Sequence, residues 1–324
     1  MSGRSAAIDA FLARCGLARA KRRPLAGDAS VRRYERITAE GRRLVLMDAP
    51  PAALDLRPFL TIGAWLRGQG LSAPEVLAAD LAEGLVLLED LGDDLFRPLL
   101  ARGGADESVL YRTAVDLLVA LQRTTPLPAL PTYDDAWLLR EARLLVEWYA
   151  PSLGAAAAAD YEAIWQELLP LARIGADGFV YVDYHADNLL WLPARTGLAR
   201  VGLLDFQDAR LGPPAYDLVS LLQDARRDVA PALALAMATR YLAARPELDR
   251  HAFAAAYAVL GAHRNAKILG LFARLAERDG KRQYLALQPR VRAQLARALR
   301  HPALAPLKAW CERHLGLQGD DAGA

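Results

Sequence analysis

The pattern of apolar and polar positions divides the chain near residue 90. Before that point, short apolar runs bounded by turn residues predict strands at 32–38, 43–49, 76–79 and 85–88. Helical spacing predicts two helices in the same region, at 5–20 and 56–66. After residue 93, helical spacing dominates. The helices predicted there span 108–122, with Ser108 as the N-cap, from 132 or 134 to about 149, 155–172, 216–225, 229–244, 247–261, 262–278, 284–299 and 303–314.

Three short apolar runs, at 179–182, 189–192 and 201–204, interrupt the helical half. They predict strands whose ends carry Asp183, Asn188 and Asp205. Phosphoryl transfer needs this combination: one carboxylate to orient a hydroxyl, and an amide and a second carboxylate to hold magnesium. We therefore predict that Asp183 is the catalytic base and that Asn188 and Asp205 are magnesium ligands. The alternative is that all three are polar residues that cap turns.

The division of the pattern predicts an α+β protein with two lobes. The predicted N-terminal lobe, 1–90, is small, rich in strands and binds the nucleotide. The predicted C-terminal lobe, 91–317, is larger, mainly helical and carries the catalytic and substrate residues. A chain of 324 residues is long enough for two such cores. The tail, 318–324, is predicted to be disordered.

Composition and charge narrow the possible partners. The chain is 53% hydrophobic and 24% charged, as in ordinary globular proteins, and its net charge of +2 gives no reason to expect nucleic acid or an anionic membrane. The two cysteines lack the spacing of a metal site or a disulfide framework. No apolar run approaches the ~18 to 20 residues of a membrane span. We expect a cytoplasmic monomer that binds a small molecule.

Two segments of the first lobe can contact a nucleotide. The small-residue loop 24–30 can bring backbone N–H groups and Ser30 close to phosphates, although a plain surface hairpin is as well supported. The acidic link 89–92 can act as a hinge whose backbone, at Glu89 and Leu91, meets an adenine edge. A simple turn between a strand and a helix explains the same link equally well.

The site motifs resemble the aminoglycoside phosphotransferase-like branch of the protein-kinase fold. The catalytic loop of that family is similar to residues 181–188 (YVDYHADN), its metal-binding segment to 205–207 (DFQ), and a following helix start to 212–218 (GPPAYDL). The resemblance implies a bilobal protein-kinase-like fold that uses ATP and Mg²⁺. It also implies that Asp217 supports the catalytic loop. For His185 we favour the same structural role over a contact with phosphate.

Further segments resemble one subgroup of that family, the anomeric kinases of N-acetylmuramate and N-acetylglucosamine. The resemblance to this subgroup implies an amino-sugar 1-kinase of peptidoglycan recycling. The segments that carry it are 28–30 with 32–34, 47–51, 88–92, 205–209 and 275–281.

The chain departs from most kinases in two places. Tyr181 replaces a histidine at the first loop position, and Met47 stands where the third strand usually carries a phosphate-contacting lysine. No lysine occurs between Lys21 and Lys267, and the helix predicted at 56–66 has no glutamate to pair with one. Our candidates to offset the negative charge of the phosphates in place of this lysine are two neighbouring arginines, Arg32 and Arg33.

The missing lysine and glutamate favour the alternative of a nucleotide-binding pseudokinase. A second alternative is a phosphotransferase acting on an aminoglycoside or another small alcohol. An aminoglycoside site requires a strongly acidic cleft, because the substrate is a polycation. The helices after Asp217 carry acidic and basic residues together, which does not favour that alternative.

The sugar contacts are predicted from helical spacing. Trp137, Glu141 and Trp148 fall on one face of a continuous helix, so Trp137 and Glu141 are candidates to stack on and hydrogen-bond a pyranose. Burial in the core is the alternative for both indoles. Asp208 either contacts the sugar or caps a turn. The cluster 263–267 can meet a lactyl carboxylate through its basic side chains, although we favour a solvated basic face.

Overall fold

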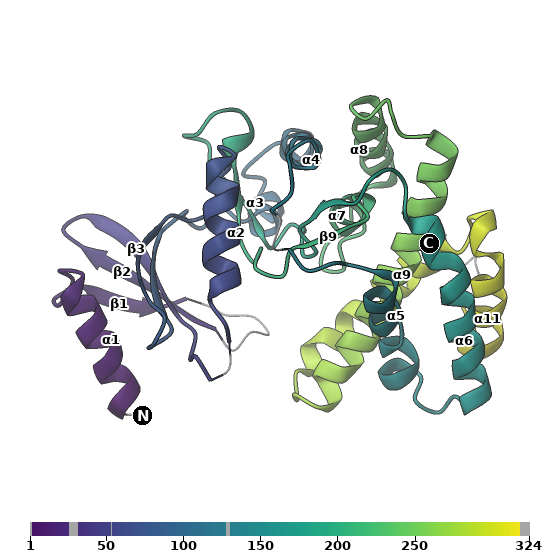
Figure 1. The fold of residues 1–324 in the computed structure, drawn as a ribbon, viewed down its shortest axis with the longest axis horizontal. Helices are drawn as coiled ribbons and strands as arrows, with labels where there is room; N and C mark the ends of the chain where they lie inside the picture. Colours follow the sequence, from purple (N-terminus) through teal and green to yellow (C-terminus); the bar gives the residue numbers. More distant parts are fainter. Residues whose placement is uncertain (1, 26–31, 53, 128–129, 318–324) are drawn as a thin grey trace. The chain divides into compact units, whose positions relative to one another are not determined.

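The structure, a computed structural model shown in Figure 1, describes residues 2–25, 32–52, 54–127 and 130–317. The chain forms two compact units. The first unit consists of Met1–Pro98 and Asn188–Asp208, and the second of Leu99–Asp187 and Ala209–Ala324. This division differs from the predicted one, which ended the first lobe at residue 90 and assigned 188–208 to the second. The predicted tail, 318–324, lies outside the described residues.

The first unit contains a five-stranded antiparallel sheet of order β1-β2-β3-β5-β4. Its strands are β1 (Lys21–Pro24), β2 (Arg33–Ala39), β3 (Arg42–Asp48), β4 (Val76–Asp80) and β5 (Leu85–Glu89). Strands β2 and β3 form a tight hairpin in which Ala39 pairs with Arg42. The two turn residues, Glu40 and Gly41, have φ values of 50° and 76°. Positive φ at both positions suits the twist of a two-residue hairpin.

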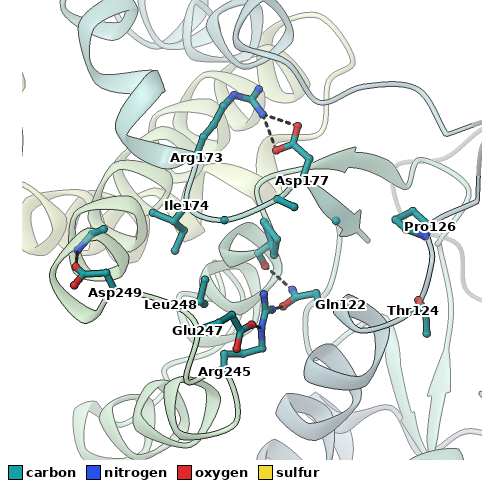
Figure 2. A pocket seen from close by; sticks show the side chains of 15 residues that line it. Gln122, Thr124, Pro126, Arg173, Ile174, Asp177, Arg245, Glu247, Leu248 and Asp249 are labelled. Carbon is teal, nitrogen blue, oxygen red and sulfur yellow. Dashed lines mark hydrogen bonds and ion pairs between the residues drawn. The ribbon is translucent and has the colours of Figure 1, made fainter.

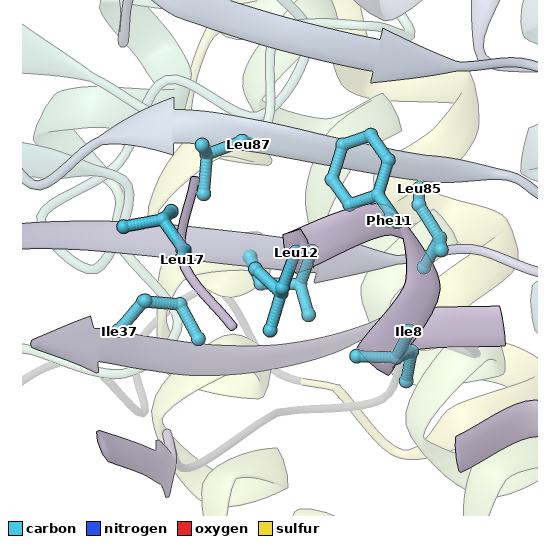
Figure 3. Packing of buried hydrophobic residues seen from close by; sticks show 8 residues of the cluster. Ile8, Phe11, Leu12, Leu17, Ile37, Leu85 and Leu87 are labelled. Carbon is cyan, nitrogen blue, oxygen red and sulfur yellow. The ribbon is translucent and has the colours of Figure 1, made fainter. Parts of the chain in front are cut away.

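Helix α1 (Ser2–Arg14) packs on this sheet. Ile8, Phe11 and Leu12 lie one helical turn apart, and Figure 3 shows them against Ile37, Leu85 and Leu87 of the strands. All of these side chains are at most 5% exposed. The spacing that predicted the first helix therefore marks a true core face, although the helix ends at Arg14 rather than near residue 20.

A separate β-hairpin joins the first unit from far along the chain. It consists of β7 (Leu189–Trp191) and β8 (Val201–Leu203), which are antiparallel, with a 3₁₀ turn (Gly197–Arg200) between them. Leu203 donates its backbone N–H to the carbonyl of Ser72 at 2.9 Å, and Leu190 bridges to Leu95. These backbone contacts explain why Asn188–Asp208 belongs to the first unit, which strand patterns alone do not reveal.

The second unit is mainly helical and carries one two-stranded sheet, in which β6 (Gly178–Val180) pairs with β9 (Arg210–Gly212). Helix α2 (Arg57–Gly68) belongs to the first unit, and α3 (Phe96–Ala101) runs across the boundary. The helices of the second unit are α4 (Glu107–Gln122), α5 (Asp135–Ala142), α6 (Ala155–Leu168), α7 (Ala215–Leu222), α8 (Pro231–Ala243), α9 (Arg250–Glu277), α10 (Gln288–Ala298) and α11 (Ala305–Leu315). Shorter helical segments are the π-helical Leu145–Tyr149 and the 3₁₀ turns Leu169–Ala172, Arg282–Leu287 and Pro302–Leu304.

Several predicted helix limits are wrong. The prediction that Ser108 caps its helix fails because Asp106 caps α4 and accepts the Ser108 N–H at 2.8 Å. The helix predicted from 132 or 134 to 149 is α5 followed by a π-helical segment. The helix predicted at 284–299 begins as a 3₁₀ turn, and α10 starts only at Gln288, with proline in its first turn.

The two helices predicted at 247–261 and 262–278 are one helix, α9, of 28 residues. Gly261 lies within this helix, and a Cβ atom there would lie 2.8 Å from the side-chain amide nitrogen of Gln223, so this glycine makes room for a neighbouring side chain. Within the described residues, no helix is both long and apolar enough to cross a membrane.

Candidate active site

Asn188 and Asp205 lie at the same end of the β7–β8 hairpin. Leu189 pairs with Leu203, and the Leu204 N–H donates to the Asn188 carbonyl at 3.0 Å. Asn188 therefore lies directly before β7. Asp205 lies after β8, with one residue, Leu204, between the end of the strand and the aspartate. The hairpin register brings together two residues that lie 17 positions apart in sequence.

The carboxylate of Asp205 is held by its neighbours and remains accessible. Its φ is 62°, a left-handed conformation that aspartate tolerates better than most residues. Gln207 Nε2 donates to Asp205 Oδ1 at 2.9 Å, and Arg32 Nη1 lies 3.3 Å from the same oxygen. The Asp205 side chain is nevertheless 43% exposed. An ordered but open carboxylate of this kind is suited to bind a cation.

Phe206 anchors this segment to α2. Its ring stacks on Phe59 with centroids 5.0 Å apart, and a Cβ atom at Gly63 would lie only 3.1 Å from the Phe206 ring. Phe206 is fully buried. The helix and the aromatic ring thus fix the position from which Asp205 projects, which makes α2 part of the support of the site.

The residues at the hairpin end fit a magnesium ion. Carboxylate and amide oxygens are the hard donors that Mg²⁺ prefers, and this ion usually takes one or two protein carboxylates together with phosphates and waters. The described residues contain no cluster of three His, Cys, Asp or Glu side chains that would form an all-protein metal cage. A ligand pair such as Asn188 and Asp205 does not require such a cage.

The backbone directly before Asp183 is held in a strained conformation. The buried carboxylate of Asp217, in the first turn of α7, accepts the N–H of Tyr181 at 2.6 Å and the N–H of Val182 at 2.9 Å. Val182 has a φ of 76°, which is unfavourable for a β-branched residue. Ser220 Oγ lies 3.5 Å from the Val182 carbonyl oxygen. These contacts fix the direction in which the chain enters Asp183.

Burial raises the pKa of Asp217 to about 7, while the two N–H donors act in the opposite direction. The rest of the loop is held as well. His185 is buried, and its Nδ1 accepts the Asp187 N–H at 3.4 Å. Asp224 Oδ2 accepts the Ala186 N–H at 3.1 Å. No local sequence pattern links Asp224 to the loop, so its role as a loop support was not predicted.

The predicted nucleotide residues lie in the first unit where the structure describes them. Ser30 lies outside the described residues. Arg33 begins β2 and is exposed, and Glu89 ends β5. Glu89 and Leu91 line a hollow of about 410 Å³ together with Arg43, residues 90 and 92–94, and residues 191–195. The link after β5 is fixed by an ion pair between Asp90 and Arg36 at 2.7 Å.

The predicted sugar residues Trp137 and Glu141 lie together in the second unit. Trp137 Nε1 donates to Glu141 Oε1 at 3.2 Å. Asp208 is exposed and accepts a hydrogen bond from Gln207 at 3.0 Å. The prediction that Trp148 shares the helix face of Trp137 is wrong, because the π-helical segment Leu145–Tyr149 interrupts the α-helical spacing.

The preference for a solvated basic face at 263–267 is also wrong. His263 and Arg264 are 0% and 4% exposed, and the Lys267 side chain is 15% exposed. Burial lowers the pKa of His263 to about 4, so this residue is neutral near pH 7. Its Nε2 lies 2.7 Å from the Leu138 carbonyl oxygen. The helical spacing was read correctly, but α9 is central to its unit and not at the surface.

A pocket of about 690 Å³ in the second unit is not the predicted site (Figure 2). It contains none of the predicted site residues. Arg173 and Asp177 form a bidentate ion pair at 2.9 Å along its edge, and Gln122 donates to the Pro214 carbonyl at 2.8 Å. These polar side chains are thus already engaged with side-chain or backbone partners.

Comparison with known proteins identifies the family. A model of the phosphotransferase enzyme family matches residues 21–253, well over half of the chain. The chain belongs to the phosphotransferase enzyme family. This phosphotransferase is 44% identical to an N-acetylmuramate/N-acetylglucosamine kinase of Caulobacter vibrioides, with 98% of each chain covered. It is 37% identical to a kinase of the same name from Pseudomonas aeruginosa, with 88% of this chain and 86% of that protein covered.

Solved structures agree on the fold of the phosphotransferase. A choline kinase from Streptococcus pneumoniae matches 90% of this chain and 98% of its own with a TM-score of 0.64, at 12% identity. The predicted α+β fold of the protein-kinase type is therefore confirmed, as is the family resemblance read from short motifs. The roles of individual site residues remain predictions.

Proposed function

We propose that this phosphotransferase uses ATP to phosphorylate the anomeric C1 hydroxyl of N-acetylmuramate and N-acetylglucosamine, a step of peptidoglycan recycling. The observation that supports these acceptors is the 44% identity, over 98% of both chains, to a protein named N-acetylmuramate/N-acetylglucosamine kinase. The hairpin end with Asn188 and Asp205 and the braced loop before Asp183 support the reaction type. The proposal includes a monomeric enzyme in the cytoplasm.

Asp183 is the proposed catalytic base. Its carboxylate accepts a hydrogen bond from the acceptor hydroxyl and orients the oxygen for attack. A loose transition state demands positioning more than full deprotonation, so a weakly basic carboxylate is sufficient. The strained and doubly held backbone at Val182 supports this role, because it fixes the direction of the loop before substrate arrives.

Asn188 and Asp205 are the proposed ligands of Mg²⁺. When bound, this ion would offset the charge of the β- and γ-phosphate oxygens. Gln207 holds the Asp205 carboxylate by its 2.9 Å hydrogen bond. Asp183 and Asn188 are five residues apart, so the chain keeps their Cα atoms within about 18 Å of each other.

The nucleotide is proposed to contact Ser30, Arg32, Arg33, Glu89 and Leu91. The usual strand lysine has no counterpart, since Met47 is fully buried and pairs with Val86. Arg32 is the best-supported replacement, because its guanidinium already lies 3.3 Å from the proposed metal ligand Asp205. A cation beside that carboxylate is suitably placed to meet phosphate oxygens.

The acceptor sugar is proposed to bind beside Trp137, Glu141 and Asp208, with His185 and Asp217 supporting the loop. Within the second unit, Trp137 and Glu141 are joined by a hydrogen bond.

The test is an assay of ADP release with ATP, Mg²⁺ and three acceptors: N-acetylmuramate, N-acetylglucosamine and kanamycin. We expect turnover on the amino sugars. Asp183→Asn should lower kcat by about 100- to 10,000-fold, because the acceptor loses its base. Asp116→Asn, on the exposed face of α4, is the matched control and should retain activity. Met47→Leu should also remain active, because that position supplies packing only.

Two outcomes would replace the proposal. Turnover on kanamycin alone would assign the chain to antibiotic modification. Nucleotide binding without turnover on any acceptor would indicate the pseudokinase that the missing lysine favours.

A further inference from the structure

Lys267 is a lysine whose charge is almost enclosed. Its side chain, on α9, is 15% exposed. The ammonium lies 2.8 Å from Glu141 Oε1 and 3.4 Å from the hydroxyl of Tyr216. An ammonium carries three N–H donors, and these two contacts occupy two of them. A nearly buried cation is retained only where partners satisfy it, and the third donor is available to water or to a ligand.

Glu141 holds Lys267 and has little capacity left for a sugar. Its Oε1 also accepts the Trp137 Nε1–H at 3.2 Å, and its Oε2 accepts the Tyr133 hydroxyl at 2.5 Å. Three donors thus surround one carboxylate, which offers about four acceptor positions. Glu141 therefore acts as the support that fixes the ammonium.

The ring faces of Trp137 are occupied as well. The guanidinium carbon of Arg140 lies 3.6 Å from the indole centroid and that of Arg210 lies 3.4 Å from it. Two guanidinium groups at stacking distance from one centroid can avoid collision only on opposite faces. In this arrangement a pyranose can lie beside Trp137, as proposed above, but cannot stack on either face of its ring. The indole instead donates its N–H to Glu141 and completes the support of Lys267.

Lys267 is tied to the loop that carries Asp183. Tyr216, which contacts the ammonium, is adjacent to Asp217, and Asp217 accepts the N–H of Val182 directly before Asp183. The charge of Asp183 lies within electrostatic reach of Lys267. An acceptor whose hydroxyl meets Asp183 would therefore bind at the loop to which Lys267 is connected through Tyr216 and Asp217.

The local charges select the kind of atom that Lys267 can bind. The positive charge of Lys267 is offset by the Glu141 carboxylate and also by Asp183. His263 is neutral near pH 7, and burial keeps the hydroxyls of Tyr133 and Tyr216 protonated. The ammonium of Lys267 is therefore already offset by carboxylates, while the nearby guanidinium groups of Arg140 and Arg210 lie against the faces of Trp137. A neutral oxygen, such as a hydroxyl or an amide carbonyl, suits the third N–H.

We propose that Lys267 binds the acceptor sugar directly, donating its third N–H to a neutral oxygen that N-acetylglucosamine and N-acetylmuramate share. Glu141 and Tyr216 hold the ammonium in place for this contact. The inference rests on the proposed function, because it takes these two sugars as the acceptors.

The test compares kinetic constants of three proteins. Removing Lys267 alone would leave Glu141 buried without its cation, so the informative variant is Lys267→Met combined with Glu141→Gln, which is neutral and keeps both shapes. Lys308→Met, at a lysine that is 40% exposed in α11, is the matched control. Each protein is assayed with N-acetylglucosamine and with N-acetylmuramate, and ATP is titrated separately.

We expect the double variant to lose roughly 10- to 100-fold in kcat/KM for both sugars, as for a hydrogen bond from a charged group. The losses on the two sugars should agree within threefold, and the KM for ATP should not change. Thermal unfolding should stay close to that of the wild type, since no buried charge is left unpaired. Lys308→Met should match the wild type in every constant.

Two results would overturn the inference. An unchanged kcat/KM in a folded double variant would show that Lys267 has a structural role only. A loss confined to N-acetylmuramate would show that the ligand is its lactyl carboxylate and not a shared oxygen. If the wild type itself phosphorylates neither sugar, the proposed function has failed, which is a different result from either of these.

Discussion

Val182, directly before the proposed catalytic base, is a single residue that the fold holds in a left-handed conformation. A left-handed conformation at a valine costs about 1 to 3 kcal/mol and persists only where its surroundings impose it. Here the imposing group is Asp217, whose buried carboxylate accepts two consecutive N–H groups. Asp205 has positive φ as well. Two strained residues thus lie next to or within the proposed constellation, and strain of this kind is concentrated at functional sites.

The buried His263 predicts how stability responds to acid. Burial lowers its pKa from 6.5 to about 4, despite the nearby Glu141 carboxylate. The folded protein therefore binds a proton less readily than the unfolded chain does. This residue does not affect stability above pH 6.5, and its unfavourable contribution grows as the pH falls towards 4. At pH 4.5 the contribution is roughly 2 to 3 kcal/mol.

Urea unfolding of the wild type and of His263→Gln at pH 7.5 and pH 4.5 measures this contribution. Glutamine can donate to the Leu138 carbonyl but does not titrate. The wild type should lose about 2 to 3 kcal/mol more than the variant between the two pH values. An equal loss in both proteins would show that His263 is not the responsible group. The surface variant His251→Gln should behave like the wild type, because His251 is exposed.

At the level of elements, α9 is the helix around which the second unit packs. It contacts α7, α10 and the π-helical segment Leu145–Tyr149, and it carries both His263 and Lys267. Gly270 lies where α9 meets the chain directly before the π-helical segment. A Cβ atom there would lie 2.1 Å from the carbonyl oxygen of Leu144. Backbone meets backbone at this point, so no side chain can move aside.

Gly270→Ala should therefore destabilise the protein by at least about 2 kcal/mol, although alanine is the better helix former. Gly68→Ala is the matched control, because Gly68 also lies in a helix but has open space at its Cβ position. That variant should be neutral or more stable by up to about 1 kcal/mol. Denaturant unfolding of both proteins tests the contrast. Equal effects would mean that the close approach of Gly270 does not constrain the fold.

The sequence predicts the elements of this protein unevenly. Strands β2, β3 and β5 follow from apolar runs, because each of them buries side chains in the core. Strand β4 was predicted as well, although its side chains alternate between half-buried and exposed. Strand β1 reads KRRP and is mostly exposed at the sheet edge, so no hydrophobic pattern reveals it. The N-cap of α4 is Asp106, but Ser108, two residues later, is an equally plausible cap from sequence alone. The π-helical segment has no local signal that spacing can detect.

At the scale of the whole molecule, the chain crosses between its units three times, after Pro98, Asp187 and Asp208. Asp183 therefore belongs to one unit, and Asn188 and Asp205 to the other. Their order along the chain was predictable from strand ends. Their division between units was not, since it depends on the backbone contacts of β7 and β8 with Ser72 and Leu95. The support of the site by Asp224 and Phe59 likewise depends on long-range packing.

Ligand-linked stability tests the metal assignment for the whole molecule. A ligand that binds only the folded state stabilises it by about 2.7 kcal/mol at 100 times its Kd. With ADP present, adding Mg²⁺ should raise the unfolding temperature further if Asn188 and Asp205 bind the ion. Asp205→Asn should lose most of this Mg²⁺-dependent increment. It should still fold, because asparagine tolerates the left-handed conformation at this position at least as well.

Asp208→Asn is the control that makes this measurement specific. Asp208 is three residues away, is also a carboxylate, and accepts a hydrogen bond from the same Gln207 amide at 3.0 Å. Its proposed role concerns the acceptor sugar, which is not present in this measurement. It should therefore keep the full Mg²⁺-dependent increment, while both variants keep the increment from ADP alone. If Asp205→Asn responds to Mg²⁺ as the wild type does, the ion is bound elsewhere and the proposed ligand pair is wrong.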